Sequence, residues 1–246
     1  MRRIIALVLS FCLILSSMPV SMLEANAATA TSYTYSGTTY QFTKAIGSST
    51  ALTGAASTTQ SAGYFLTADI SISQTWDIAQ KNIYLDLNGH SITMTGSNRV
   101  ITLSSSGSLY LFDTNTDGNG NGIITGGKSS DGGGLYINSG CTFKQYGGKI
   151  SGNTSTGDCG GIRNSGTYVL YGGGLYNNTA AANCGGLGNG GTFQMHGGEI
   201  SGNTANGTTG GGGLYNLSAG TMTINGGTIS GNQSTNTGAL GGGGIF

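Results

Sequence analysis

The chain has 246 residues and a net charge of zero, and only 7% of its residues are charged, against about 25% in an ordinary globular domain. Binding to nucleic acid through its phosphates needs a surplus of Lys and Arg, so nine basic residues balanced by nine acidic ones exclude that class of partner. Glycine is unusually abundant, with 48 residues. Because the glycines and the apolar residues recur at regular intervals, we predict an ordered fold and not a disordered chain.

Residues 1–27 have the pattern of a secretory signal peptide. Two arginines stand near the start, residues 4–15 form an apolar stretch, and Ala-Asn-Ala at 25–27 is a cleavage motif. The apolar stretch is too short for a membrane span, and no second one follows. We therefore expect a mature chain that starts at Ala28, has no membrane span, and is secreted or displayed at the cell surface.

Strand signals begin after a segment of a different composition. Residues 28–60 are rich in Ser, Thr and Ala, and we interpret them as a linker or an N-terminal cap. Residues 64–72 alternate apolar and polar side chains, and similar short runs lie within 82–94 and 108–112. Gly, Asn, Ser and Asp separate these runs, which predicts strands of about four or five residues joined by turns.

A repeat dominates the rest of the chain. Gly-Gly-x-(Ile/Leu)-x-x-Asn starts at residues 147, 172, 197 and 226, in steps of 25, 25 and 29. A Thr-led clause and a Gly-Gly-aliphatic clause recur at similar steps, which is typical of a solenoid. We predict an all-β parallel β-helix over residues 61–246, with about six coils, roughly 25 residues per coil and three short strands in each coil. The last clause is another repeat start and not a polar cap, so we expect the β-helix to be incomplete at the C-terminus.

The repeat also predicts which side chains stack. One inward column contains Leu135, Ile162, Leu187, Leu214 and Ile245. A second inward column contains Ile150, Leu175, Ile200 and Ile229. A third stack, which points inward or outward, contains Phe143, Tyr168, Phe193 and Met222. Each buried Leu or Ile stabilises the fold by about 1.5–3 kcal/mol.

Asparagine recurs with the same steps. The column contains Asn153, Asn178, Asn203 and Asn232. Stacked asparagines tolerate left-handed corners and form hydrogen bonds along the stack. Such a row can also bind sugars, but we favour a structural ladder.

Two of the four cysteines follow the repeat. Cys159 and Cys184 lie 25 residues apart, and each precedes a Gly-Gly pair. They should therefore lie on neighbouring coils, about 4.8 Å apart, which is within the Cα range of a disulfide. We expect either a disulfide or a stacked pair of thiols.

These motifs carry a resemblance to known proteins. The Gly-Gly-x-(Ile/Leu) and Ser-Gly-Asn-Thr rhythm, with the run from Asn82 upstream, resembles secreted right-handed parallel β-helix proteins of the pectin-lyase-like superfamily. The repeats also resemble those of polymorphic outer membrane proteins, which are surface adhesins, although Ile150-Ser-Gly-Asn stands where those repeats prefer a Phe before the Asn. The resemblance covers residues 64–246 and implies a right-handed β-helix that acts as an adhesin.

The same superfamily contains polysaccharide lyases and hydrolases, so the acidic residues decide between binding and cleavage. Hydrolysis of a glycosidic bond needs two facing carboxylates. The expected mature chain has Asp69, Asp77, Asp86, Asp113, Asp117, Asp131, Asp158 and Glu199. On the repeat spacing, no two of them occupy adjacent coils of one column, and Asp86 is expected to anchor a turn. We expect a non-catalytic adhesin-like or structural interaction module whose partners are surface glycans or host or cell-surface proteins; the alternative is a polysaccharide lyase or glycoside hydrolase.

One segment partly matches a calcium-binding loop. Asp113, Asn115 and Asp117 follow the first half of an EF-hand pattern, and Gly118 completes it. The twelfth position is Ile124, where the EF-hand loop needs a bidentate Glu. We favour an ordinary Gly/Asn turn between strands, and a weak calcium site, the one cofactor that the sequence suggests, is the alternative.

Aromatic residues also recur in rows. Tyr136, Tyr215 and Phe246 share one repeat position, and Tyr146 and Tyr171 share another. Rows of outward tyrosines stack on sugar rings in some proteins and shield a sheet from water in others. We favour shielding.

Overall fold

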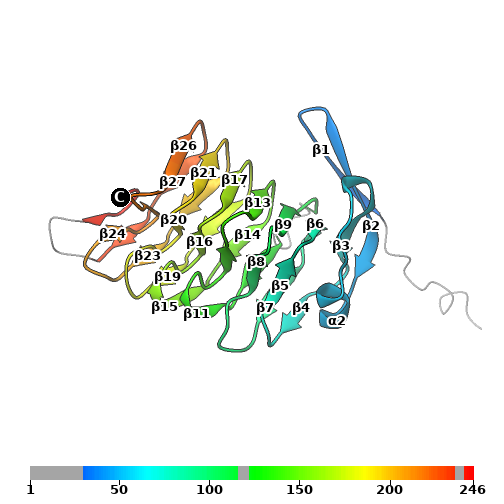
Figure 1. Ribbon diagram of the computed structural model, residues 1–246, viewed down its shortest axis with the longest axis horizontal. Helices are drawn as coiled ribbons and strands as arrows, with labels where there is room; N and C mark the ends of the chain where they lie inside the picture. The colour runs from blue at the N-terminus through cyan, green and yellow to red at the C-terminus, as the bar shows by residue number, and fades with distance from the viewer. Residues whose placement is uncertain (1–29, 116–121, 236–240) are drawn as a thin grey trace, which may run out of the picture.

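Strands recur along the chain in the order that the repeat predicts. The computed structural model describes residues 30–115, 122–235 and 241–246 and shows a parallel β-solenoid of about six turns, with successive turns roughly 26 residues apart. Figure 1 shows the strands stacked along the long axis, coil after coil. The predicted fold class is confirmed. The expected signal peptide, residues 1–27, lies outside the described residues, in which no helix is long and apolar enough to cross a membrane.

Four sheets run along the solenoid. Sheet A contains β1 (Thr31–Tyr35), β2 (Thr38–Ile46), β3 (Gly63–Leu66), β6 (Asn82–Asp86), β9 (Ser108–Phe112), β13 (Thr142–Gln145), β17 (Thr167–Leu170), β21 (Thr192–Met195) and β26 (Thr221–Ile224). Sheet B contains β4 (Ile70–Ile72), β7 (Ser91–Met94), β10 (Ile123–Thr125), β14 (Lys149–Ser151), β18 (Gly174–Tyr176), β22 (Glu199–Ser201) and β27 (Thr228–Ser230). Sheet C contains β5 (Trp76–Ala79), β8 (Ile101–Ser104), β12 (Leu135–Ile137), β16 (Ile162–Asn164), β20 (Leu187–Asn189) and β25 (Leu214–Asn216).

The fourth sheet distinguishes the later coils from the early ones. Sheet D contains β11 (Lys128–Asp131), β15 (Thr154–Asp158), β19 (Thr179–Ala180), β23 (Thr204–Ala205) and β28 (Gln233–Ser234). The early coils have three strands, as expected, and from Lys128 onward a fourth short strand lies between sheets B and C. It fits because the connecting segment lengthens from residues 95–100 in one coil to residues 126–134 in the next. A further short pair, β24 (Gly210–Gly211) with β29 (Gly241–Gly242), lies near the last described coil.

The core consists of the predicted columns. Leu135, Ile162, Leu187 and Leu214 are direct neighbours in sheet C and are fully buried, and Ile245 pairs with Leu214 at the end of the row. The Ile150 column is likewise in register in sheet B. The stack whose direction was open points inward, because Phe143, Tyr168 and Phe193 have no exposed surface.

Residues 31–62 are folded onto the first coil. Strands β1 and β2 form an antiparallel hairpin, and β2 also pairs in parallel with β3. The short helix α2 (Ser49–Thr53) and the 3-10 turn η2 (Gln60–Ala62) connect the hairpin to β3. Leu52 of α2 is fully buried in the main core, so this Ser/Thr/Ala-rich segment contributes apolar contacts to the end of the solenoid.

The hairpin also covers aromatic side chains on the outer face of sheet A. Phe112 stacks on Tyr146 and Tyr146 on Tyr171, with ring centroids 4.7 and 4.8 Å apart. Tyr40 of the hairpin packs on Tyr146, and their hydroxyls are 3.2 Å apart. Tyr35 packs on Tyr171 at 4.8 Å. Tyr146 is only 7% exposed beneath the hairpin, which agrees with shielding for this residue, whereas Tyr171 is half-buried.

The aromatic cluster on this face, which also includes the partly buried Tyr84 and Tyr110, predicts a loss of stability in alkali. Burial raises the pKa of Tyr84 to about 12, with further contributions from neighbouring Tyr110, and burial also raises the pKa of Tyr146. Between pH about 10 and pH about 12 the unfolded tyrosines lose their protons while the folded ones keep them, so the free energy of unfolding should fall with rising pH.

Urea unfolding at a series of pH values measures this fall, which should be shallower in Tyr84→Phe than in the parent chain. A free energy of unfolding that stays constant between about pH 9 and about pH 12 contradicts the prediction.

Candidate functional site

The asparagine column forms a continuous hydrogen-bonded ladder. The Nδ2 atoms of Asn153, Asn178 and Asn203 donate to the Oδ1 atom of the next asparagine, at 3.1, 2.9 and 2.9 Å. Their backbone N–H groups donate to the same oxygens at 3.0 Å. These three side chains have no exposed surface, and Asn232 ends the row. The ladder is therefore structural and is not available to bind sugars.

The sequence did not reveal a second ladder, on the inner side of sheet C. Asn164 donates to Asn189, and Asn189 donates to Asn216, each at 2.7 Å. The row begins as an apolar column, since Asn164 is in register with Ile137. The signal available was the recurrence of Asn two residues after the aliphatic residue of each clause, such as Ile162.

Removing one member of the first ladder should be costly. Asn178→Ala removes the side-chain donor to the backbone carbonyl of Ile150 and one of the two donors to Asn203 Oδ1, and it leaves the backbone N–H of Asn153 without its acceptor. Each unpaired buried group costs about 1–3 kcal/mol, so we expect a loss of about 2–4 kcal/mol in the free energy of unfolding, measured with urea. The exposed Asn225 is the matched control, and Asn225→Ala should change stability by less than about 0.5 kcal/mol. Equal losses in the two variants would contradict a structural ladder.

Asp86 is a turn anchor, as the sequence suggests. It is fully buried, and its Oδ1 atom accepts the backbone N–H groups of Asn88 and Thr114, each at 2.9 Å. Its Oδ2 atom accepts the hydroxyls of Thr31 and Thr114, each at 2.5 Å. Both oxygens are therefore occupied by donors that join the hairpin and two coils.

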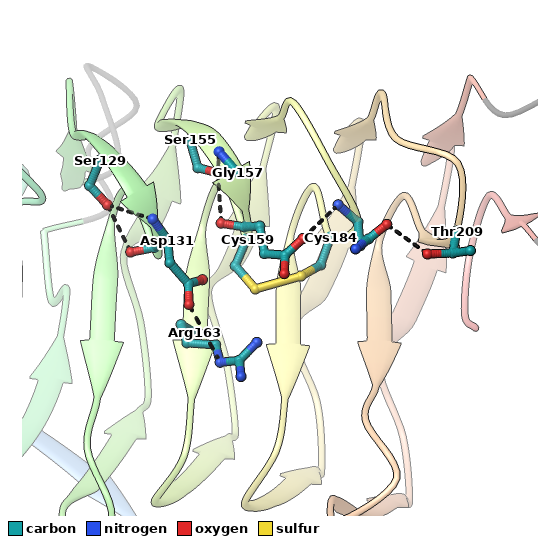
Figure 2. The surroundings of a disulfide bond; sticks show 10 residues. Ser129, Asp131, Ser155, Gly157, Cys159, Arg163, Cys184 and Thr209 are labelled. Carbon is teal, nitrogen blue, oxygen red and sulfur yellow. Dashed lines mark hydrogen bonds and ion pairs between the residues drawn. A yellow bond between two sulfur atoms is a disulfide. The ribbon is translucent and has the colours of Figure 1, made fainter.

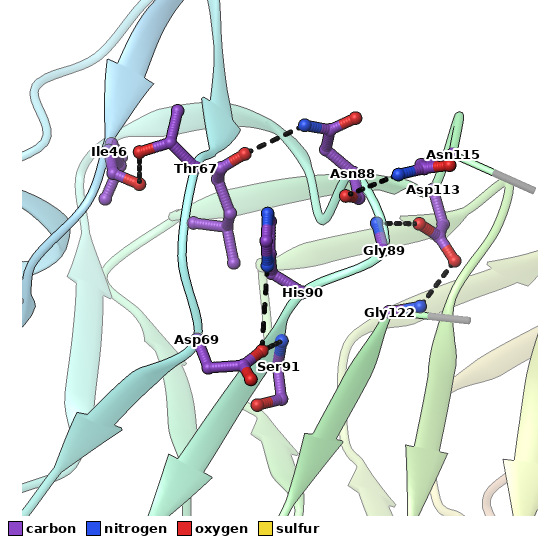
Figure 3. Close-up of polar contacts among 11 residues, drawn as sticks. Ile46, Thr67, Asp69, Asn88, Gly89, His90, Ser91, Asp113, Asn115 and Gly122 are labelled. Atoms are coloured by element: carbon purple, nitrogen blue, oxygen red, sulfur yellow. Dashed lines mark hydrogen bonds and ion pairs between the residues drawn. The ribbon is translucent and has the colours of Figure 1, made fainter. Parts of the chain in front are cut away.

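Asp113 closes the neighbouring loop (Figure 3). Its two carboxylate oxygens accept the N–H groups of Gly89 at 2.7 Å and Gly122 at 2.6 Å, and burial raises its pKa. Asn115 donates to the carbonyl of Asn88 at 3.4 Å, while Asp117 lies outside the described residues. In the described part of the chain, no three His, Cys, Asp or Glu side chains are grouped to hold a metal ion. Calcium binding by Asp113, Asn115 and Asp117 stays a prediction, which these two N–H donors make less favourable.

A carboxylate and an imidazole meet nearby, at the start of sheet B (Figure 3). His90 Nδ1 is 3.7 Å from Asp69 Oδ1, which also accepts the backbone N–H of Ser91 at 2.7 Å. This N–H, more than His90, lowers the pKa of Asp69. The Asp69 side chain is 75% exposed, so solvent screens its charge and the pair contributes little to stability.

Cys159 and Cys184 form a disulfide between two neighbouring coils (Figure 2), with their Cα atoms 4.4 Å apart. The bridge lies over the outer side of Gly188, and a Cβ atom added there would meet both sulfur atoms. Both cysteines are fully buried, and their sulfur atoms fill the space that a side chain at position 188 would otherwise occupy. The remaining described cysteine, Cys141, is a buried thiol.

This packing predicts that position 188 tolerates only glycine while the disulfide is intact. Gly188→Ala should lower the free energy of unfolding by about 1–3 kcal/mol, the usual cost of overpacking. Gly190→Ala is the control, because its Cβ would meet only the Asn164 carbonyl oxygen, at 3.6 Å. Urea unfolding of both variants under oxidising conditions measures the difference. If Gly188→Ala is as stable as Gly190→Ala, the disulfide does not occupy this space.

The structure corrects one expectation about the acidic residues. Asp131 and Asp158 are direct partners on adjacent strands β11 and β15. A fixed 25-residue step misses this pair, because a bulge between Ser129 and Asp131 shifts the register. Arg163 Nε is 3.7 Å from Asp131 Oδ2 (Figure 2). Burial raises the pKa of Asp131. The positive charge of Arg163 lowers this pKa, and the negative charge of Asp158 raises it further.

The outer row of sheet C passes beside this pair. It contains Tyr136, Arg163, Gly188 and Tyr215, in register from coil to coil. The guanidinium of Arg99 lies 4.6 Å from the centre of the Tyr136 ring. Tyr215 and Phe246 stack at 5.4 Å. Tyr136 therefore packs on Arg99, and Tyr215 packs on Phe246.

Two further groups lie where the repeat places them. Lys149, Gly174 and Glu199 share one row of sheet B, and the ring of Tyr176 lies 5.7 Å from Lys149 Nζ. Burial raises the pKa of Tyr176, and the neighbouring Glu199 carboxylate raises it further. His196 stacks on Tyr171 at 5.2 Å.

Two hollows in the surface are lined mainly by hydroxyl groups. One, of about 200 Å³, is lined by Ser49, Thr50, Thr53, Ser71, Ile72, Ser73 and Gln74. The other, of about 360 Å³, is lined by Ser97, Lys128, Ser129, Ser130, Thr154 and Thr156. No carboxylate lines either hollow.

Comparison of the chain with protein-family models, with curated proteins and with solved structures finds no match. The parallel β-solenoid rests on the structure itself. The finer resemblance to pectin-lyase-like proteins and to polymorphic outer membrane protein repeats stays an expectation from the sequence.

Proposed function

We propose that this protein is a secreted or cell-surface interaction module, which binds surface glycans or cell-surface proteins on its outer faces and does not cleave them. The observation that carries the proposal is that two buried carboxylates, those of Asp86 and Asp113, are held by structural donors. Asp86 accepts four hydrogen bonds and Asp113 accepts two backbone N–H groups. A general acid or nucleophile must instead face the bond that it cleaves.

The surface supports binding as well. The outer row of sheet D that starts at Lys128 continues without charge: Thr154, Thr179 and Thr204 lie side by side on successive strands. Hydroxyl groups both donate and accept hydrogen bonds, and a row of them matches a polymer that presents hydroxyls at regular intervals. The rigid solenoid holds such groups about 4.8 Å apart without any loop having to become ordered.

An extracellular location is part of the proposal. It is supported by the disulfide between Cys159 and Cys184, because disulfides persist mainly in oxidising compartments. The signal-peptide pattern of residues 1–27 supports it independently.

One observation favours the alternative, a polysaccharide lyase or glycoside hydrolase. Asp131 and Asp158 face each other across adjacent strands, and the pKa of Asp131 is raised, as the pKa of a general acid is. Against this, Asp131 lies beside Arg163, and Asp158 Oδ1 accepts the N–H of Asn183 at 3.1 Å. Binding remains the better-supported function.

The experiment measures binding and cleavage in the same samples. The chain from Ala28 onward is incubated with immobilised dextran, xylan, polygalacturonate and intact bacterial cell-wall material, with calcium or with a chelator. We expect saturable binding to at least one of these, no release of reducing or unsaturated sugars, and no effect of calcium. Asp131→Asn and the control Asp77→Asn, an exposed residue that accepts the Ser104 hydroxyl, should bind equally well.

Sugar release that is lost in Asp131→Asn and retained in Asp77→Asn would establish the enzymatic alternative. If none of the four materials binds, the proposal of a glycan-binding module is wrong.

A further inference from the structure

We propose that the larger hollow, beside β11, is a subsite for an anionic group of a glycan, either a carboxylate or a sulfate. This inference rests on the proposed function and specifies its ligand class and its place on the molecule. The hollow of about 360 Å³ is large enough for one sugar unit with its substituent, since ligand pockets begin at about 300 Å³.

The hollow results from a change in the cross-section of the solenoid. β11 is the first strand of sheet D, and the preceding coil has only the segment 95–100 in its place (Figure 1). The N–H of Lys128 donates to the carbonyl of Asn98 at 2.9 Å, which ties this segment to β11. Ser97 on one side and Thr154 and Thr156 on the other then enclose the hollow. The site is therefore fixed by strand pairing and not by a free loop.

The side chains in the hollow select an oxyanion. Lys128 supplies an ammonium group, and Ser97, Ser130 and Thr156 supply hydroxyls that can donate hydrogen bonds. The hydroxyls of the other two lining residues, Ser129 and Thr154, donate to the backbone carbonyls of Asp131 and Gly127. Among the described residues the ion pairs are His90 with Asp69 and Arg163 with Asp131, so neither neutralises Lys128. The carboxylate on the same strand, that of Asp131, lies beside the guanidinium of Arg163, whose positive charge compensates its negative charge. No aromatic ring lines the hollow, so stacking on a neutral sugar does not explain it.

The surroundings favour an anion carried by a polymer over a free anion. Lys128 is in register with Thr154, and the row continues through Thr179 and Thr204 to Gln233. These side chains lead away from the hollow at steps of about 4.8 Å. A glycan anchored by its acidic group in the hollow can place further hydroxyls along this row, whereas a free anion contacts the hollow alone.

The test uses three polymers with the same backbone. Affinity of the chain from Ala28 onward is measured by calorimetry for dextran sulfate, carboxymethyl dextran and dextran, and for inorganic sulfate, at fixed ionic strength. We expect Lys128→Gln to weaken binding of both charged dextrans at least tenfold, and Ser130→Ala to weaken it several-fold without changing the charge. Lys144→Gln, which removes a charge from the outer face of sheet A beside Tyr110, is the matched control and should bind like the parent chain. Thermal melts confirm that the variants fold.

Each other outcome overturns the inference in a distinguishable way. Equal weakening in Lys128→Gln and Lys144→Gln means non-specific charge attraction. Inorganic sulfate that binds as tightly as dextran sulfate means a free-anion site. Binding of the charged dextrans that Lys128→Gln leaves unchanged, or no binding of either charged dextran, refutes the subsite. The four materials of the preceding experiment decide the proposed function separately.

Discussion

In-register parallel pairing is the constraint on which the rest of this structure depends. Each strand lies directly above the equivalent strand of the next coil, so the side chains of the repeated columns have near-copies of themselves as neighbours about 4.8 Å away. A buried polar side chain is tolerated in such a stack only if it can form hydrogen bonds with copies of itself in the neighbouring coils. Asparagine does so, because its amide can donate to the asparagine of the next coil and accept from that of the previous coil, and both ladders use this property.

The same constraint accounts for the low charge of the chain. A charged residue repeated in every coil would place like charges about 4.8 Å apart along a column, which is unfavourable. Charges here are accordingly scattered, and neutral or small residues separate them, as Gly174 separates Lys149 from Glu199. The exception, Asp131 beside Asp158, has Arg163 next to it. Recognition of a charged ligand then depends on few side chains, and Lys128 is the one that supplies the positive charge in the proposed glycan subsite.

The repeat made the columns predictable, and features without a repeat were not. The aliphatic columns, the Asn153 ladder and the Cys159–Cys184 proximity follow from one period read along the sequence. The bulge that aligns Asp131 with Asp158 shifts the register locally, so a fixed step misses it. The second ladder begins partway along an apolar row, and the hairpin contact of Tyr40 with Tyr146 joins residues with no common period. The hollow beside Lys128 depends on where the fourth sheet starts, which the pattern of three clauses does not mark.

The central claim is that neighbouring coils are held together by stacks of identical side chains that fulfil one another's hydrogen-bonding needs. A double-mutant cycle on Asn178 and Asn203 tests it most directly, because each side chain is the other's hydrogen-bond partner. The four chains of the cycle are compared by the free energy of unfolding in urea. The account predicts that Asn178→Ala and Asn203→Ala together cost less than the sum of the single variants, with a coupling of about 1–3 kcal/mol. Additivity within about 0.3 kcal/mol would contradict it, because the two amides would then act independently.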